Sequence, residues 1–249
     1  MLLLLIMKED SVNKMEFTYD AYRKLLLTFK NNGYQDIFYQ EADMTKKQVI
    51  LRHDIDNSIE DALKIAEIEK EVGMKSTYFV LIGTEFYNLF TKRSKEMIEK
   101  IIAYGHSVQL HFDVTNYEIG SKGDLIQMIE KEMRILEMIT KQPVHVVSFH
   151  RPLREYFNET ISNSFISAYD KQFFSDFKYV SDSRRNWKDD PYEAVANGYR
   201  HIQCLTHAFW YDERERTAHD KIALFKTKCA DKTKEALYQN ITDLDELIK

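Results

Sequence analysis

Short apolar runs alternate with amphipathic segments along most of the chain, and this alternation predicts strands and helices in turn. The apolar runs are rich in β-branched and aromatic residues, and they predict strands at 48–52, 76–81, 107–110, 144–149, 177–180 and 201–205. Apolar residues recur near every 3.6 positions in the segments between them, which predicts helices at 17–31, 58–71, 95–104, 125–140, 191–196 and 222–228. Gly73 is a plausible C-cap for the second helix. Strands followed by helices predict a parallel sheet with helical crossovers.

A parallel sheet of this kind fits either an open doubly wound fold or a closed barrel. The chain has 249 residues with only 3 Pro and 7 Gly and no linker-like stretch, so we expect one domain over residues 16–249. Residues 1–15 are expected to form a disordered or surface segment. The apolar run Met1–Met7 is too short for a signal peptide or a membrane span, which favours a cytoplasmic protein.

Composition and charge narrow the function classes. The net charge is −5 and the Lys and Arg residues are scattered, so no nucleic-acid partner is expected. Cys204 and Cys229 form neither a CxxC pair nor a disulfide framework. The 15 Tyr and 15 Phe residues are compatible with a sugar-binding cleft, although aromatic residues more often fill cores. Nothing in the sequence specifies the oligomeric state.

Acidic and imidazole side chains stand at four predicted strand ends. The four segments are 53–56, 111–113, 148–152 and 206–210, and they contribute Asp54, Asp56, His111, His150 and His207. The carboxyl ends of parallel strands meet at one rim, so these side chains should converge. Packing alone does not explain four such ends. By contrast, His106 at the other end of its strand is expected to be structural, and the acidic residues Glu67, Glu69 and Glu71 to form a solvated helix face.

Asp54 and Asp56 are two residues apart, so in an extended chain both carboxylates point the same way. Such a pair can hold a divalent cation with one carboxylate and activate a water with the other. Catalytic zinc takes three protein ligands and keeps an open position, and an aspartate with two histidines is a fitting set. The sequence therefore predicts a metal-dependent hydrolytic site.

These blocks, in this order from Val49 to Trp210, resemble the polysaccharide deacetylase family (NodB homology, carbohydrate esterase family 4). The resemblance implies an α/β fold, namely a single-domain distorted (β/α)7 barrel. It also implies a metal-dependent carbohydrate deacetylase that removes an acetyl or other N-acyl group from an amino sugar or glycan precursor, with zinc as the expected metal.

The resemblance also implies residue roles. Asp54 corresponds to the base and Asp56 to a metal ligand, while segment 105–111 resembles the second motif with His111 as a ligand. Segment 149–152 resembles the third motif, in which Arg151 would orient the base. Segments 181–187 and 205–207 resemble the last two motifs, with Asp182 orienting a catalytic histidine and His207 as general acid. Candidates for the sugar site, with core packing as the alternative for each, are Phe149, Trp187, Trp210 and Tyr211.

One departure from the family pattern concerns the metal. The family usually has a second histidine four residues after the first, and here that position is Thr115. We expect His150 to be the third ligand, with His207 as the alternative. Two other functions stay open: hydrolysis of a small non-sugar amide on the same fold, and sugar binding without catalysis.

Overall fold

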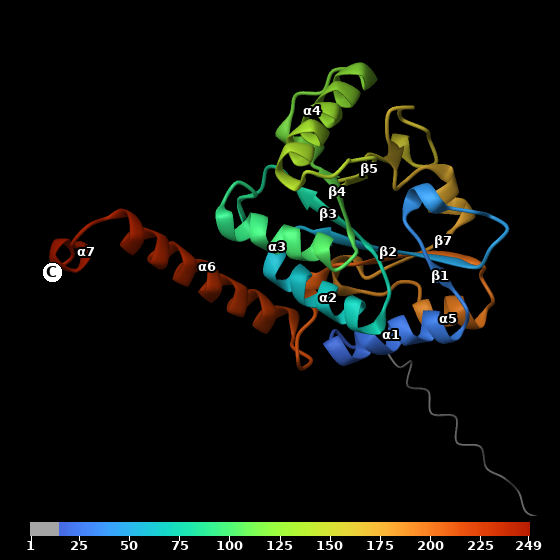
Figure 1. Cartoon of the computed structure of the whole chain (residues 1–249), viewed down its shortest axis with the longest axis horizontal. Coiled ribbons are helices and arrows are strands. Elements are labelled where there is room, and N and C mark those ends of the chain that lie inside the picture. Colours follow the sequence, from blue (N-terminus) through green and yellow to red (C-terminus); the bar gives the residue numbers. More distant parts are fainter. Residues whose placement is uncertain (1–14) are drawn as a thin grey trace, which may run out of the picture.

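The computed structural model describes residues 15–249 and contains one parallel sheet with flanking helices (Figure 1). The strands are β1 (Gln35–Asp36), β2 (Gln48–Ile55), β3 (Thr77–Leu81), β4 (Ser107–Phe112), β5 (Val146–Phe149), β6 (Ile166–Ser167), β7 (Lys178–Ser181) and β8 (His201–Thr206). The helices are α1 (Tyr19–Asn31), α2 (Ile59–Val72), α3 (Lys92–Ala103), α4 (Lys122–Thr140), α5 (Pro191–Ala196), α6 (Ala218–Asn240) and α7 (Leu244–Leu247).

The strand order is β6-β5-β4-β3-β2-β8-β7, with β1 added beside the start of β2, and every pairing is parallel. The two outer strands of this path, β6 and β7, do not pair with each other in residues 15–249. The sheet is therefore a half-open barrel. This confirms the expected single-domain, distorted (β/α)7 architecture.

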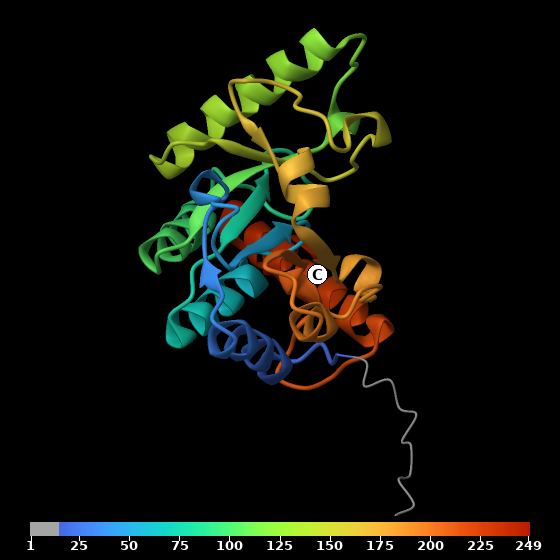
Figure 2. The same cartoon turned by 90° about the vertical axis from the view of Figure 1, so that its right-hand side faces the viewer.

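A row of helices covers the outside of the barrel. The row runs α5, α1, α2, α3, α4, each helix contacting the next (Figures 1 and 2). Helix α2 begins where the Ser58 hydroxyl accepts from the backbone N–H of Asp61, and it ends at Gly73 in the left-handed region (φ 74°). The predicted glycine C-cap is confirmed, and the cap sets where the chain turns back into β3.

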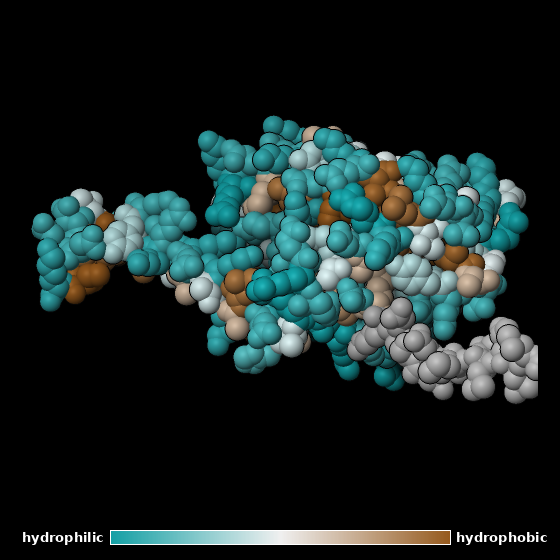
Figure 3. Space-filling model, turned by 90° about the horizontal axis from the view of Figure 1, so that it is seen from below, coloured by the Kyte–Doolittle hydropathy of each residue, from teal (hydrophilic) through white to brown (hydrophobic). Residues whose placement is uncertain are grey.

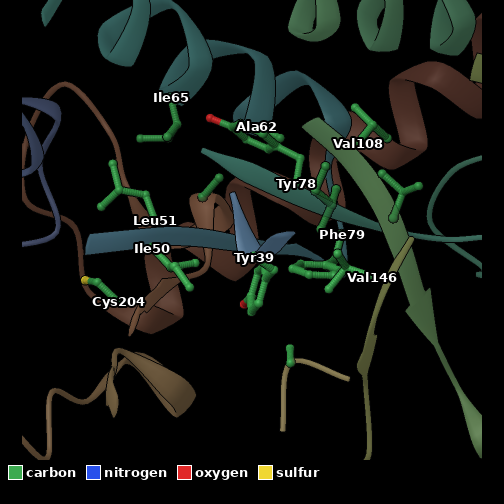
Figure 4. Close-up of a cluster of buried hydrophobic side chains, with 14 of the residues drawn as sticks. Tyr39, Ile50, Leu51, Ala62, Ile65, Tyr78, Phe79, Val108, Val146 and Cys204 are labelled. Atoms are coloured by element: carbon green, nitrogen blue, oxygen red, sulfur yellow. The ribbon is translucent and has the colours of Figure 1, made fainter. Parts of the chain in front are cut away.

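The central strands are buried on both faces because they separate the helices from the barrel interior. In Figure 4, Ala62 and Ile65 of α2 lie on one side of the strands and Tyr39 lies on the other. Side chains of a strand alternate between these sides, so Arg52 and Asp54 of β2 share the interior face while His53 between them faces the helices. This alternation decides which residues reach the site.

The structure extends several of the expected elements. Helix α6 spans 218–240 rather than 222–228, because only its first part packs against the body and apolar periodicity marks only that part. The remainder projects from the barrel, and Figure 3 shows a largely hydrophilic arm with apolar residues near its far end. Strands β1 and β6 have two residues each and are too short to show a period. Strand β2 runs three residues further than expected, to Ile55.

Glu69 was expected on a solvated face but is fully buried between α2 and the sheet. Its carboxylate accepts hydrogen bonds from the hydroxyls of Tyr22 (2.6 Å), Ser76 (2.5 Å) and Tyr78 (2.6 Å) and contacts Nε2 of His53 at 2.7 Å. Burial alone would raise the pKa of Glu69, but His53 and these hydrogen bonds lower it to about 2.

The Glu69→Gln variant should lose about 1–3 kcal/mol of unfolding free energy near neutral pH, because the partners lose a charged acceptor. The folded-state pKa is below the unfolded value, so this contribution is complete above about pH 4.5 and disappears as pH falls toward 2. Chemical denaturation across this range should show the two proteins converging at acid pH. Glu71→Gln is the matched control, since Glu71 is exposed and forms a surface ion pair with Arg23. A pH-independent gap between Glu69→Gln and wild type would contradict this assignment.

The expectation for residues 1–15 lies outside the described residues except for Met15, which is buried. Within residues 15–249, no helix combines the length and apolar character that a bilayer span requires.

Candidate active site

The strand ends converge as the parallel sheet requires. Asp54, Asp56, His111, His150 and His207 all line one cavity of about 220 Å³ at the carboxyl ends of β2, β4, β5 and β8. The cavity thus gathers the acidic and imidazole candidates from four separate strands.

Three of these residues form a metal-sized cluster. Oδ1 of Asp56 lies 3.2 Å from Nε2 of His111 and 3.0 Å from Nδ1 of His150, and one ligand atom from each lies within 4.8 Å of the others. Ligand atoms around tetrahedral zinc with 2.0–2.1 Å bonds are about 3.3 Å apart. The two distances from the Asp56 oxygen match this spacing, so one carboxylate oxygen and two imidazole nitrogens could hold a divalent cation with an open position.

Both histidines are held in place by the protein. Nδ1 of His111 forms a 2.6 Å hydrogen bond with Oγ of Ser148, which leaves Nε2 facing Asp56. The backbone N–H of His150 donates to the carbonyl of Phe112. Burial opposes ionisation of Asp56, but hydrogen bonds with the two imidazoles keep its pKa well below the usual range. The carboxylate is therefore available as a ligand.

Asp54 is held by Arg52, from two positions earlier on β2. The guanidinium donates Nε–H to Oδ1 (2.9 Å) and Nη2–H to Oδ2 (2.8 Å), and both side chains are buried. Burial alone would raise the pKa of Asp54, but the charge and hydrogen bonds of Arg52 hold it below the usual value. The result is an ionised carboxylate of fixed direction, with Oδ2 3.8 Å from Nε2 of His111.

Arg151 was expected from the family resemblance to orient Asp54, but among residues 15–249 its guanidinium contacts Thr115 and Asp113 and not Asp54. Its side chain is 59% exposed, and its guanidinium donates to the hydroxyl of Thr115 (2.6 Å) and lies 3.6 Å from Asp113. Arg52 pairs with Asp54 instead, because its side chain shares the strand face of Asp54. An arginine within an apolar strand was the sequence signal for this pair, and it was missed.

His207 and Asp182 form a second pair. Nδ1 of His207 lies 2.6 Å from Oδ1 of Asp182, and the buried carboxylate also accepts the backbone N–H of His207. Burial opposes the charged imidazole, but Asp182 outweighs it and raises the pKa of His207 to about 9. Nε2 lies 3.9 Å from Oδ2 of Asp56. His207 therefore presents a protonated nitrogen toward the metal-sized cluster.

The four aromatic candidates for the sugar site separate in the structure. Phe149 lines the cavity that contains Asp54. Trp210 lines a neighbouring apolar pocket. Tyr211 is fully buried against Phe17 and Tyr22, so it is a core residue. Trp187 packs against the core and lines neither this cavity nor that pocket. For Tyr211 and Trp187 the structure thus favours the core-packing alternative, because the chain after β8 turns Tyr211 inward and Trp187 packs against the core after β7.

A larger polar cavity of about 710 Å³ adjoins the cluster and includes Asp56 and His150 in its lining. Arg151 and Thr115 lie on its wall together with Glu132 of α4. Burial raises the pKa of Glu132 to about 7, and the hydroxyl of Tyr117 donates to its carboxyl group at 2.5 Å. Thr115, which stands where the resembled family has a second histidine, therefore lies on the wall of a cavity large enough for a sugar.

No family model and no curated protein matches this chain. Among solved structures, a pseudoenzyme of carbohydrate esterase family 4 from Bacillus anthracis is 18% identical with a TM-score of 0.47, and the match covers 80% of this chain but only 65% of that one. A family 4 carbohydrate esterase from Bacillus anthracis is 19% identical over 91% of both chains, with a TM-score of 0.45.

A third match is the peptidoglycan deacetylase PdaC from Bacillus subtilis, 17% identical over 77% of this chain and 87% of that one, with a TM-score of 0.44. Similarity at this level does not extend to activity. The first two structures carry the name of the family that the sequence motifs resemble.

Proposed function

We propose that the protein is a metal-dependent hydrolase that removes an acetyl or other N-acyl group from an amino sugar or glycan precursor, with zinc as the metal. The observation that carries the proposal is the Asp56–His111–His150 cluster with two further groups in reach. Oδ2 of Asp54 is 3.8 Å from His111, and Nε2 of His207 is 3.9 Å from Asp56. A carboxylate base and a protonated imidazole beside one metal site suit amide hydrolysis.

A divalent cation held by Asp56, His111 and His150 would polarise the acyl carbonyl and make water a stronger nucleophile. Asp54, kept ionised by Arg52, takes the proton as water attacks the carbonyl carbon. His207 donates the proton on Nε2 to the departing nitrogen as the C–N bond breaks, which gives a carboxylate and a free amine. Asp182 holds Nδ1 and thereby keeps the imidazole in the donating orientation.

The test is release of acetate from a panel of N-acetylated sugars by protein freed of metal and then supplied with zinc. We expect activity only after zinc addition and only with acetylated amino sugars. Turnover confined to cyclic or linear non-sugar amides would favour the second candidate hydrolase. Sugar binding without turnover, unchanged in Asp54→Asn, would favour a non-catalytic protein. A cytoplasmic location and a glycan precursor as substrate stay predictions.

Asp182→Asn should lower kcat by roughly 10- to 100-fold, because a neutral amide stabilises the imidazolium less and allows the wrong tautomer. Steady-state acetate release measures the effect. Asp189→Asn is the matched control, since Asp189 is an exposed aspartate that pairs with Lys178. An unchanged kcat in Asp182→Asn would remove His207 from the proposed mechanism.

A further inference from the structure

An apolar pocket of about 670 Å³ lies at the base of the helical arm, beside the catalytic rim. Its apolar lining consists of Phe86, Phe209, Trp210, Ile222, Phe225 and Cys229. The volume is in the range of small-molecule sites, roughly 300–1,000 Å³. Nothing in the proposed hydrolysis uses this pocket.

The wall contributed by α6 is fixed to the body. Nζ of Lys221, which is buried, donates to the carbonyl of Tyr211 at 2.9 Å. Further along α6, Nζ of Lys232 donates to Oε1 of Glu60 at 2.7 Å. Helix α6 therefore leaves the barrel next to the start of α2 (Figure 1). These two hydrogen bonds hold the segment of α6 that contributes Ile222 and Phe225 to the pocket lining.

An edge-to-face chain of aromatic rings lines the pocket. The ring centroid of Phe225 is 5.5 Å from that of Phe86 and 5.2 Å from that of Phe209, and Phe209 is 4.8 Å from Trp210. Phe86 and Ile222 are nonetheless 46% and 45% exposed. An apolar surface that stays open to water beside a catalytic cavity is typical of a binding site.

The pocket is continuous with the catalytic centre. Asn57, Glu85 and Phe86 line both this pocket and the 710 Å³ polar cavity, which reaches Asp56 and His150. Asn57 directly follows the proposed metal ligand Asp56. One molecule can therefore place an acylated polar end at the cluster and an apolar end under α6.

We propose that this pocket receives an alkyl or aryl group carried by the acylated sugar, so that the substrate is an amphipathic glycoside. This inference rests on the proposed function. The polar residues of the lining are Asn57 and Glu85, where the pocket meets the polar cavity, and the exposed Lys226. A second sugar ring seated among the six apolar side chains would therefore leave most of its hydroxyl groups without hydrogen-bond partners. An apolar group loses no hydrogen bonds on entry and gains from removal of its surface from water.

The test compares binding of methyl and octyl β-glycosides of N-acetylglucosamine, the latter below its micelle concentration, to zinc-loaded Asp54→Asn protein by calorimetry. We expect the octyl glycoside to bind at least about tenfold more tightly, since several methylenes leave water. Phe225→Ser or Ile222→Ser in the same background should bring this ratio close to one. Phe90→Ser is the matched control, because Phe90 is 59% exposed and lies outside the pocket lining.

Equal affinities of the two glycosides, or a ratio that both pocket variants leave unchanged while they remain folded, would overturn the inference. So would tighter binding of the two-ring sugar N,N′-diacetylchitobiose that depends on Phe225, since the pocket would then be a sugar subsite. If the wild type hydrolyses both glycosides and the two bind equally tightly, the proposed function stands and the proposed role of the pocket is wrong. Phe225-dependent octyl binding without any hydrolysis supports the pocket and counts against the proposed function.

Discussion

Asp56→Asn is expected to abolish divalent-metal binding and to lower the rate of acyl hydrolysis by at least about 10³-fold. Asp56 Oδ1 lies within 3.2 Å of both imidazoles of the cluster, so loss of this carboxylate removes the ligand between the two histidines. A metal ion supplies several kcal/mol of transition-state stabilisation, and each 1.36 kcal/mol corresponds to about tenfold in rate. Elemental analysis of purified protein and acetate release measure the two effects.

Asp113→Asn provides the matched control for metal content. Asp113 is also a buried acid at a strand end, but its carboxylate accepts hydrogen bonds from Thr115 and stands outside the cluster. We expect this variant to keep one equivalent of metal. Full metal content in Asp56→Asn, or loss of metal in both variants, would show that the cation binds elsewhere.

Arg52→Met is expected to destabilise the protein by about 3–5 kcal/mol and to lower the hydrolysis rate. The substitution leaves the buried Asp54 carboxylate without its ion-pair partner, and an uncompensated buried charge costs this much. The remaining Asp54 also loses the two hydrogen bonds that fix its direction. Denaturant unfolding of Arg52→Met, measured in parallel with Arg151→Met, tests the assignment.

Arg151→Met should change the unfolding free energy by no more than about 0.5 kcal/mol, because this guanidinium is largely exposed. The comparison decides which arginine supports the base. If Arg151→Met were the more damaging substitution for hydrolysis in a stably folded protein, the role would return to the residue that the family resemblance indicates.

The sequence located most of the fold because each central strand is a continuous apolar run and each packed helix shows a 3.6-residue period. The strands run parallel, so their carboxyl ends meet at one rim. The five residues at these ends could therefore be predicted as one set, namely Asp54, Asp56, His111, His150 and His207. The same periodicities also place two further side chains. Glu69 lies four positions after Ile65 on the buried face of α2, and Arg52 lies two positions before Asp54 on the interior face of β2.

Other features depended on contacts between residues far apart in the chain, which local pattern does not encode. The turn after β8 buries Tyr211 against α1 and leaves Trp210 at a pocket, although the two aromatics are adjacent in sequence. The hydrogen bond from Arg151 to Thr115 joins residues that are 36 positions apart in the sequence. The sequence by itself thus determined which strand ends carry the candidate site residues and which residue types could hold a metal, because both follow from local periodicity and residue chemistry. Only the tertiary structure decided where the Arg151 side chain lies and how α6 closes an apolar pocket, because both depend on packing between distant segments.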